Sequence, residues 1–209
     1  MKTVLCFGDS NTWGYDPDQP RRFSTDERWT MRLQTQISSN YRIIEEGQNS
    51  RTTVFEDPFE QGKRGLDYLH PCLESHHPDL VIIVLGTNDL QTRFNATASD
   101  ISKGAARLVQ IAQQFQHAFM EKPPEVLLVS PPPVLEVGPF IDSFVGAEEK
   151  SRELAYFYEL RAQELGCHFL NAADYIQTSK TEGVHWQREE HAKFADALAD
   201  IIPTILPSC

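Results

Sequence analysis

Residues 3–12 read Thr3-Val4-Leu5-Cys6-Phe7-Gly8-Asp9-Ser10-Asn11-Thr12, an apolar run that stops at a glycine followed by small polar residues. Residues 4–7 show no polar alternation, so both faces of this strand should be covered, as in a parallel sheet flanked by helices. Gly8 allows a tight turn, and a serine just past it lies at the carboxyl edge of the sheet, where open α/β folds bind ligands. Ser10 is therefore a candidate nucleophile. On this segment alone, the alternative that Asp9 and Ser10 only cap the next helix stays open.

Further strands are predicted along the chain at 41–45, 79–85, 125–129 and 167–170. Helical periodicity predicts helices from near Thr25 or Asp26 through Ile37, at 62–74, from a cap at Ser99 or Asp100 through Phe119, at 148–165 and at 189–201. When strands alternate with helices, each connection must return over a face of the sheet. The sequence therefore predicts one domain, 1–209, of the α/β class: a three-layer α/β/α sandwich around a five-stranded parallel sheet.

The composition is that of an ordinary globular protein. The chain has 209 residues, of which 40% are hydrophobic, and its 19 basic and 30 acidic residues give a net charge of −11. This charge argues against nucleic acid or a membrane surface as the main partner and favours a small-molecule substrate. The apolar run near the start is too short for a signal peptide and no later run approaches a membrane span, so a cytoplasmic location is expected. The cysteines lack paired spacing and are expected to be free thiols: Cys6, Cys72, Cys167 and Cys209.

Several polar groups should meet at the carboxyl edge of such a sheet although they are far apart in the sequence. Ser10 follows the first predicted strand, Asn88 follows the third, and Glu182-Gly183-Val184-His185 follows the fifth. A serine nucleophile needs an imidazole to take its proton and a carboxylate to orient that imidazole, and we assign these roles to His185 and Glu182. The oxyanion of a tetrahedral intermediate needs fixed donors. The candidates are the main-chain N–H groups of Ser10 and Gly47 and the side-chain amide of Asn88.

The residues around Ser10 are expected to contact the substrate. Trp13 and Tyr15 would form hydrophobic walls for an acyl or aryl group, with the alternative that they only pack the first turn. Asp9 and Asn11, on either side of Ser10, are assigned to the same substrate-binding set. His76 and His77, with Cys72 nearby, offer no further clustered ligands, so neither a metal nor another cofactor is expected.

In order along the chain, four blocks resemble the motif blocks of the SGNH (GDSL-like) hydrolases: Gly8-Asp9-Ser10, Gly47, Gly86-Thr87-Asn88-Asp89 and His185. Segments 7–14, 44–47, 50–53 and 129–133 look like the bacterial arylesterase and acyltransferase branch in particular. The resemblance extends from residue 4 to about residue 200. It implies a flavodoxin-like sandwich, ester hydrolysis through an acyl-enzyme without a metal, and, in this branch, a homo-oligomer whose loops narrow the pocket.

Two departures from the family pattern affect the predicted site. The family usually has aspartate three residues before the histidine, whereas this chain has Glu182, which is one methylene longer; Asp174 on the same loop is the alternative acid. Many members have leucine after the serine, whereas this chain has Asn11, so the mouth of the pocket is expected to be more polar.

The leading hypothesis is a serine esterase for small acyl or aryl esters, with water or an alcohol resolving the acyl-enzyme. The same machinery would serve a carbohydrate acetylesterase, a thioesterase or a lysophospholipase. A catalytically silent binding protein is the alternative from another class, raised by Glu182. The apolar loop 134–145 should cover either the site or another subunit, and it predicts self-association.

Overall fold

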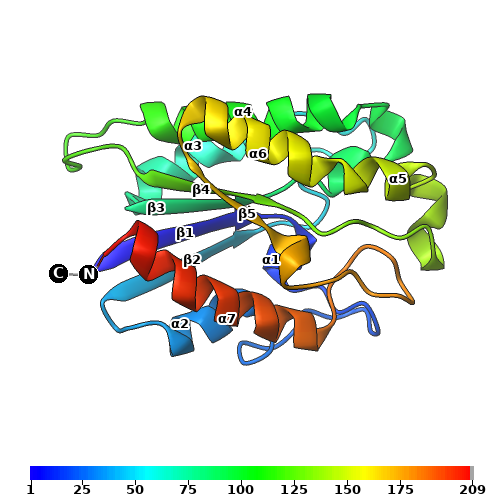
Figure 1. Ribbon diagram of the computed structural model, residues 1–209, viewed down its shortest axis with the longest axis horizontal. Helices are drawn as coiled ribbons and strands as arrows, with labels where there is room; N and C mark the ends of the chain where they lie inside the picture. The colour runs from blue at the N-terminus through cyan, green and yellow to red at the C-terminus, as the bar shows by residue number, and fades with distance from the viewer. Residues whose placement is uncertain (208–209) are drawn as a thin grey trace.

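The computed structural model describes residues 1–207; Cys209, predicted to be a free thiol, lies outside the described residues. The strands are β1 (Lys2–Gly8), β2 (Tyr41–Gly47), β3 (Leu80–Val84), β4 (Glu125–Ser130) and β5 (His168–Asn171). They form one parallel sheet of five strands in the order β2-β1-β3-β4-β5 (Figure 1). The predicted α/β class with a five-stranded parallel sheet is confirmed.

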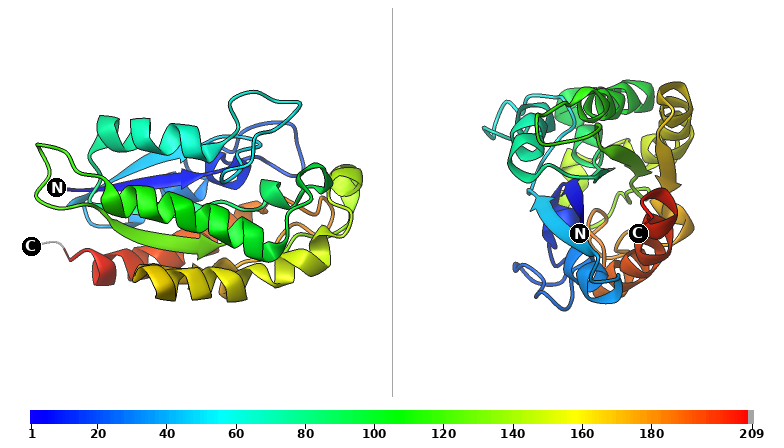
Figure 2. Two further views of the ribbon diagram at one scale, coloured as in Figure 1. Left: turned by 90° about the horizontal axis from the view of Figure 1, so that it is seen from above. Right: turned by 90° about the vertical axis from the view of Figure 1, so that its left-hand side faces the viewer.

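Helices cover both faces of this sheet. On one face lie α3 (Gly65–His76), α4 (Ala98–Gln114) and α6 (Leu154–Leu165), preceded by the short α5 (Ala147–Arg152); on the other lie α2 (Trp29–Gln36) and α7 (Arg188–Ile205). The end-on view in Figure 2 shows the two helical layers on opposite sides of the strands. The three-layer arrangement predicted from the alternation of strands and helices is therefore also confirmed.

The core is divided by the sheet into two apolar layers, and β1 contributes to both. Leu5 and Phe7 pack in the layer under α3, α4 and α6, whereas Val4 and Cys6 pack in the layer under α2 and α7. All four side chains are fully buried. The absence of polar alternation in residues 4–7 thus has its cause in a strand that is covered on both faces.

Several predicted helix boundaries differ from the structure. Helix α3 begins at Gly65 instead of residue 62, and α7 continues past residue 201 to Ile205. For the starts of α2 and α4, a side chain explains the change. Helix α2 begins at Trp29, because the Glu27 carboxylate accepts hydrogen bonds from the N–H and the hydroxyl of Ser24 (2.9 and 2.7 Å) and holds the preceding residues in a turn. Helix α4 is capped by Thr97, which forms a capping box with Asp100, rather than by Ser99 or Asp100.

Two predicted helices also end or continue differently. The backbone becomes extended at Phe115, so α4 ends at Gln114, and Phe119 lies outside it with 83% of its surface exposed. The predicted helix 148–165 is divided at Glu153 into α5 and α6. Such boundaries depend on tertiary packing that periodicity does not record.

Short helices follow the strands at the carboxyl edge of the sheet. They are α1 (Ser10–Trp13), which follows β1, and the 3-10 turns η1 (Asn88–Leu90) and η2 (Thr92–Phe94), η3 (Gly138–Ser143) and η4 (Ala172–Asp174). These elements carry Ser10, Asn11 and Asn88, whereas Glu182 and His185 lie on the loop between η4 and α7. Within residues 1–207, no helix has the length and apolar character needed to cross a membrane.

Candidate active site

Ser10 is the first residue of α1, directly after the turn that ends β1. A Cβ atom on Gly8 would lie 2.0 Å from the hydroxyl oxygen of Thr12, so only glycine fits where the chain turns into α1. The Asp9 carboxylate caps α1 by accepting a hydrogen bond from the N–H of Asn11 at 2.9 Å. The helix-cap interpretation therefore holds for Asp9. It does not exclude a chemical role for Ser10, whose side chain lines a cavity.

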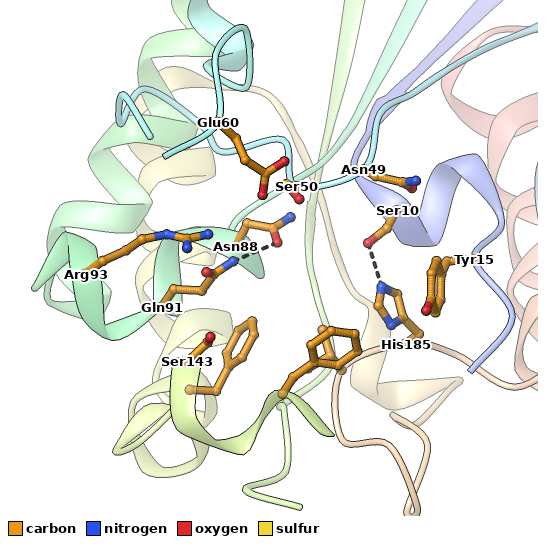
Figure 3. A pocket seen from close by; sticks show the side chains of 13 residues that line it. Ser10, Tyr15, Asn49, Ser50, Glu60, Asn88, Gln91, Arg93, Ser143 and His185 are labelled. Atoms are coloured by element: carbon orange, nitrogen blue, oxygen red, sulfur yellow. Dashed lines mark hydrogen bonds between the residues drawn. The ribbon is translucent and has the colours of Figure 1, made fainter. Parts of the chain in front are cut away.

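The Ser10 hydroxyl is in contact with His185, which comes from the loop between η4 and α7. The distance from Ser10 Oγ to His185 Nε2 is 2.8 Å, although the two residues are 175 positions apart in the sequence (Figure 3). The imidazole ring stacks on Tyr15, with ring centroids 4.1 Å apart, and meets the Phe140 ring edge-on at 5.7 Å. Two aromatic side chains therefore hold the ring against Ser10.

Glu182 contacts the other nitrogen of the same imidazole. Its Oε1 lies 2.6 Å from His185 Nδ1, and its Oε2 accepts hydrogen bonds from the main-chain N–H groups of Val184 (2.9 Å) and His185 (2.7 Å). The alternative acid, Asp174, instead accepts a hydrogen bond from the Asn171 amide at 2.9 Å. The longer glutamate side chain thus reaches the ring, and both of its oxygens are used.

The protonation pattern of this group follows from the carboxylate. Burial alone raises the pKa of Glu182, but the hydrogen bond and charge of His185, together with the main-chain N–H groups of His185 and Val184, outweigh burial and hold the pKa below its usual value. An ionised carboxylate can only accept, so the ring nitrogen that faces it, His185 Nδ1, carries a proton. In the neutral ring, Nε2 then accepts from the Ser10 hydroxyl. This is the state in which a histidine can take a proton from serine.

Asn88 lies across the cavity from Ser10, in the turn that follows β3. One N–H of its amide is donated to the Arg51 carbonyl (3.0 Å), and its Oδ1 accepts from the Gln91 side chain (3.2 Å). These two bonds fix which end of the amide is nitrogen. The second N–H of the amide remains for a group in the cavity (Figure 3).

Gly47 ends β2 beside Gly8 but is not among the residues that line the cavity. A Cβ atom on Gly47 would lie 2.2 Å from the main-chain nitrogen of Trp13, so glycine is required here by the close approach of α1. The proposed donation from the Gly47 N–H to an oxyanion stays a prediction.

The cavity has a volume of about 360 Å³ and two chemically different sides. Besides Ser10, Asn88 and His185, one side is apolar, with Tyr15, Phe140, Phe144 and Val184, and the other is polar, with Asn49, Ser50, Glu60, Gln91, Arg93 and Ser143. Among the described residues, no group of three or more His, Cys, Asp or Glu side chains is arranged to hold a metal ion.

Of the four residues predicted to contact the substrate, only Tyr15 lines the cavity. Asp9 and Asn11 are each 1% exposed and lie beneath it, so Asn11 does not make the mouth of the pocket polar. Trp13 instead packs against Arg22, whose guanidinium lies 5.2 Å from the centre of the indole ring. The physical reason is that Ser10 begins a helix, in which successive side chains point in different directions.

Apart from Ser143, which lies on the loop 134–145, the polar side of the cavity comes from loops to which the sequence assigned no role. Ser50 follows the Gly47 turn and has a positive φ of 63°, which is uncommon for a residue other than glycine. Gln91 and Arg93 follow Asn88 by three and five residues. Their position just after a predicted strand end was an available signal, because such loops share one edge of a parallel sheet.

The apolar loop 134–145 covers the site from one side. Phe140 and Phe144 line the cavity, whereas Val137, Ile141 and Val145 are exposed by 36%, 40% and 59%. One of the two alternatives for this loop, that it covers the site, is therefore observed. The exposed apolar side chains of the same loop are left on the outer surface.

Two further carboxyl groups are fully buried behind the site. Burial raises the pKa of Asp9 to about 6, although the Asn11 N–H and the charges of His185 and Arg51 act in the opposite direction. Burial likewise raises the pKa of Asp89 to about 6, although this side chain accepts hydrogen bonds from the N–H and the hydroxyl of Thr53. Both groups therefore carry an electrostatic cost when they are ionised.

Known proteins resemble this chain both in a family model and in solved structures. A model of the GDSL-like lipase/acylhydrolase family matches residues 6–198. The chain is similar to an aryl esterase from M. smegmatis (38% identity, TM-score 0.94, covering 99% of this chain and 100% of that chain). It is also similar to a carbohydrate acetylesterase from Sinorhizobium meliloti (36% identity, TM-score 0.94, with the same coverage of 99% and 100%).

The predicted resemblance to the SGNH hydrolases is confirmed by these matches. A more distant structure, a lipolytic protein of the G-D-S-L family from Veillonella parvula, shares the fold at 15% identity, with a TM-score of 0.71 and coverage of 96% of this chain and 98% of that chain. Among curated proteins, none matches the chain significantly.

Replacing Asp9 with asparagine should change how stability depends on pH. The carboxyl of Asp9 loses its proton near pH 6 in the folded chain, against an ordinary pKa of 3.8. Between these values unfolding releases a proton, so the contribution of Asp9 to stability falls as pH rises, by roughly 3 kcal/mol in total. Asparagine still accepts the Asn11 N–H and does not titrate.

We therefore expect the free energy of unfolding of Asp9→Asn, relative to that of the unmodified protein, to rise between pH 4 and pH 7. Urea titrations at several pH values measure this difference. A difference that stays constant across the window would show that Asp9 ionises normally in the folded state.

Proposed function

Since the chain belongs to the GDSL-like lipase/acylhydrolase family and is a carboxylic ester hydrolase, we propose that it hydrolyses small acyl esters through an acyl-enzyme formed on Ser10. The observation that carries this proposal is the contact of Ser10 Oγ with His185 Nε2 at 2.8 Å, with Glu182 at the opposite ring nitrogen. Ser10 attacks the ester carbonyl while His185 takes the hydroxyl proton. Glu182 then stabilises the imidazolium and keeps its ring in place.

The negative charge that develops on the carbonyl oxygen needs donors that are fixed beforehand. The Asn88 amide supports this role, because its bonds to Arg51 and Gln91 hold it in one orientation without using its second N–H. The N–H of Ser10, at the start of α1, and the N–H of Gly47 complete the proposed oxyanion hole. His185 afterwards returns its proton to the departing alcohol, and water attacks the acyl-enzyme.

The size and lining of the cavity support a short acyl group. A volume of about 360 Å³ suits an acetyl or aryl ester better than the long chain of a lysophospholipid. The apolar side formed by Tyr15, Phe140 and Phe144 would exclude part of the water, which supports transfer of the acyl group to an alcohol as a second outcome. A catalytically silent binding protein is less well supported, because Glu182 reaches the imidazole despite its extra methylene.

The polar side of the cavity favours acetylated carbohydrates as a second candidate substrate. Asn49, Ser50, Glu60 and Ser143 supply side-chain donors and acceptors for the hydroxyl groups of a sugar. An aryl alcohol would leave these groups without partners from the substrate. The acyl part would be acetyl in both cases, so only the alcohol differs.

A cytoplasmic location and self-association are part of the same proposal. The location is supported by Cys6, Cys72 and Cys167, which are free thiols. Self-association is supported by the exposed apolar side chains Ile141 and Val145 on the loop that covers the site.

Removing the Asn88 amide should lower kcat on p-nitrophenyl acetate by roughly 10² to 10³-fold, the scale observed for single oxyanion donors. Steady-state kinetics of Asn88→Ala measure this, with the exposed Asn40→Ala as the control that should keep its rate. Ser10→Ala should lose both hydrolysis and labelling by a fluorophosphonate. If Asn88→Ala is fully active, the oxyanion role is wrong; if Ser10→Ala is still active, the acyl-enzyme is wrong.

The double variant Glu60→Ala, Ser143→Ala should distinguish the two substrate classes. Removing two groups that could bond sugar hydroxyls should lower kcat/KM on an acetylated glucose by roughly 10-fold or more, and leave p-nitrophenyl acetate hydrolysis within about twofold. Glu56→Ala is the matched control, because Glu56 lies on the same loop but outside the cavity lining. Equal effects on both esters would count against carbohydrate recognition by this wall.

Light scattering at micromolar concentration should give a mass larger than one chain. Val145→Asp places a charge among the exposed apolar side chains of the loop 134–145 without touching the cavity lining, and should reduce that mass. A monomeric unmodified protein would contradict self-association. An unchanged mass in Val145→Asp would show that the interface lies elsewhere on the protein.

A further inference from the structure

The side-chain amide of Asn11 bonds the main chain on both sides of His185. Its Oδ1 accepts a hydrogen bond from the N–H of Trp186 at 3.0 Å, and its Nδ2 donates to the carbonyl of Val184 at the longer distance of 3.5 Å. The residue is 1% exposed and does not line the cavity. An amide suits this place because it is both a donor and an acceptor and carries no charge.

We propose that Asn11 is a positioning residue, which holds the main chain of His185 at a fixed distance from Ser10; this rests on the proposed function of both residues. Ser10 and Asn11 are neighbours in α1, so the helix that carries the hydroxyl also carries the group that holds the imidazole. Any movement of α1 relative to the sheet therefore moves both partners of the 2.8 Å contact together.

Other hydrogen bonds of the His185 loop act within the loop or toward another segment. The N–H of Ser179 bonds the His185 carbonyl (2.8 Å), and the N–H of Leu135 bonds the Gly183 carbonyl (2.8 Å). These bonds fix the shape of the loop but not its distance from α1. The Asn11 amide joins the loop to the helix that carries Ser10.

The roles of Asn11 and Glu182 are linked through one residue. The N–H of Val184 is bonded to Glu182 Oε2, and the carbonyl of Val184 is bonded to Asn11 Nδ2. Both polar groups of this residue are thus held by side chains, directly before His185. A glutamate side chain has one more rotatable bond than an aspartate side chain. Because the N–H and the carbonyl of Val184 are both hydrogen-bonded, the positions open to the Glu182 carboxylate are limited.

The experiment compares Asn11→Leu, which keeps the approximate volume and removes both bonds, with the unmodified protein. Because His185 would be displaced from Ser10 while the cavity wall is unchanged, kcat on p-nitrophenyl acetate should fall roughly 10 to 100-fold with KM within about twofold. The rate of fluorophosphonate labelling should fall by a similar factor. Asn11→Ala also removes both bonds without adding a charge, so its loss in kcat should be of similar size.

Gln34→Leu is the matched control. The Gln34 amide makes the same pair of bonds on the edge strand β2, donating to the Tyr41 carbonyl (3.1 Å) and accepting from the Ile43 N–H (2.7 Å). It should lower the melting temperature without changing kcat of the folded protein. Unchanged kcat in Asn11→Leu, or an equal loss of kcat in Gln34→Leu, would overturn the proposal.

Two results keep this test separate from that of the proposed function. If the unmodified protein is not labelled by the fluorophosphonate, the proposed function itself fails. If it is labelled and hydrolyses the ester while Asn11→Leu does so equally well, only the positioning role fails. Should Asn11→Leu not fold, Asn11→Ala decides, and a kcat equal to that of the unmodified protein would overturn the positioning role.

Discussion

The site depends on the common level at which three neighbouring parallel strands end. Gly8 of β1 is paired with Gly47 of β2 and with Val84 of β3. Strands β1, β2 and β3 therefore end at the same level of the sheet. The short segments that follow β1 and β3 are enough to bring Ser10 and Asn88 to one cavity. The lack of side chains on the two glycines lets α1 lie close to both strand ends. A larger residue at either position would push α1 away from the strand ends and shift Ser10 relative to Asn88, which follows β3.

Much of this arrangement could be predicted from the sequence. Strand ends can be recognised locally, and parallel pairing places the carboxyl ends of the strands at one edge of the sheet. Glycine and small polar residues after apolar runs identified Ser10 and Asn88. His185 and Glu182 were identified by their place in the loop after the last strand. The contact of Ser10 with His185 is observed at the edge where it was expected. The chemical roles of these residues stay predictions.

The remaining features depend on the directions of side chains and on tertiary packing, which the spacing of residues in the sequence does not show. Trp13 and Asn11 are close to Ser10 in sequence, but the helix α1 turns their side chains away from the cavity. The polar side of the cavity arises from loops without periodicity and includes Glu60, which lies seven residues after the segment 50–53. The helix boundaries at Trp29 and Thr97 were decided by local side-chain hydrogen bonds, two in each case. In each case a tertiary contact or a local cap outweighed the periodic signal.

The bond from the Leu135 N–H to the Gly183 carbonyl joins the aromatic cover of the cavity to the segment that carries His185. A bulky alcohol group that lifts the cover therefore also pulls on the main chain two residues before the imidazole. Discrimination against large substrates would then act on the chemical step and not only on binding. An oversized ester would then bind but react slowly, and it would compete with the good substrate for the site.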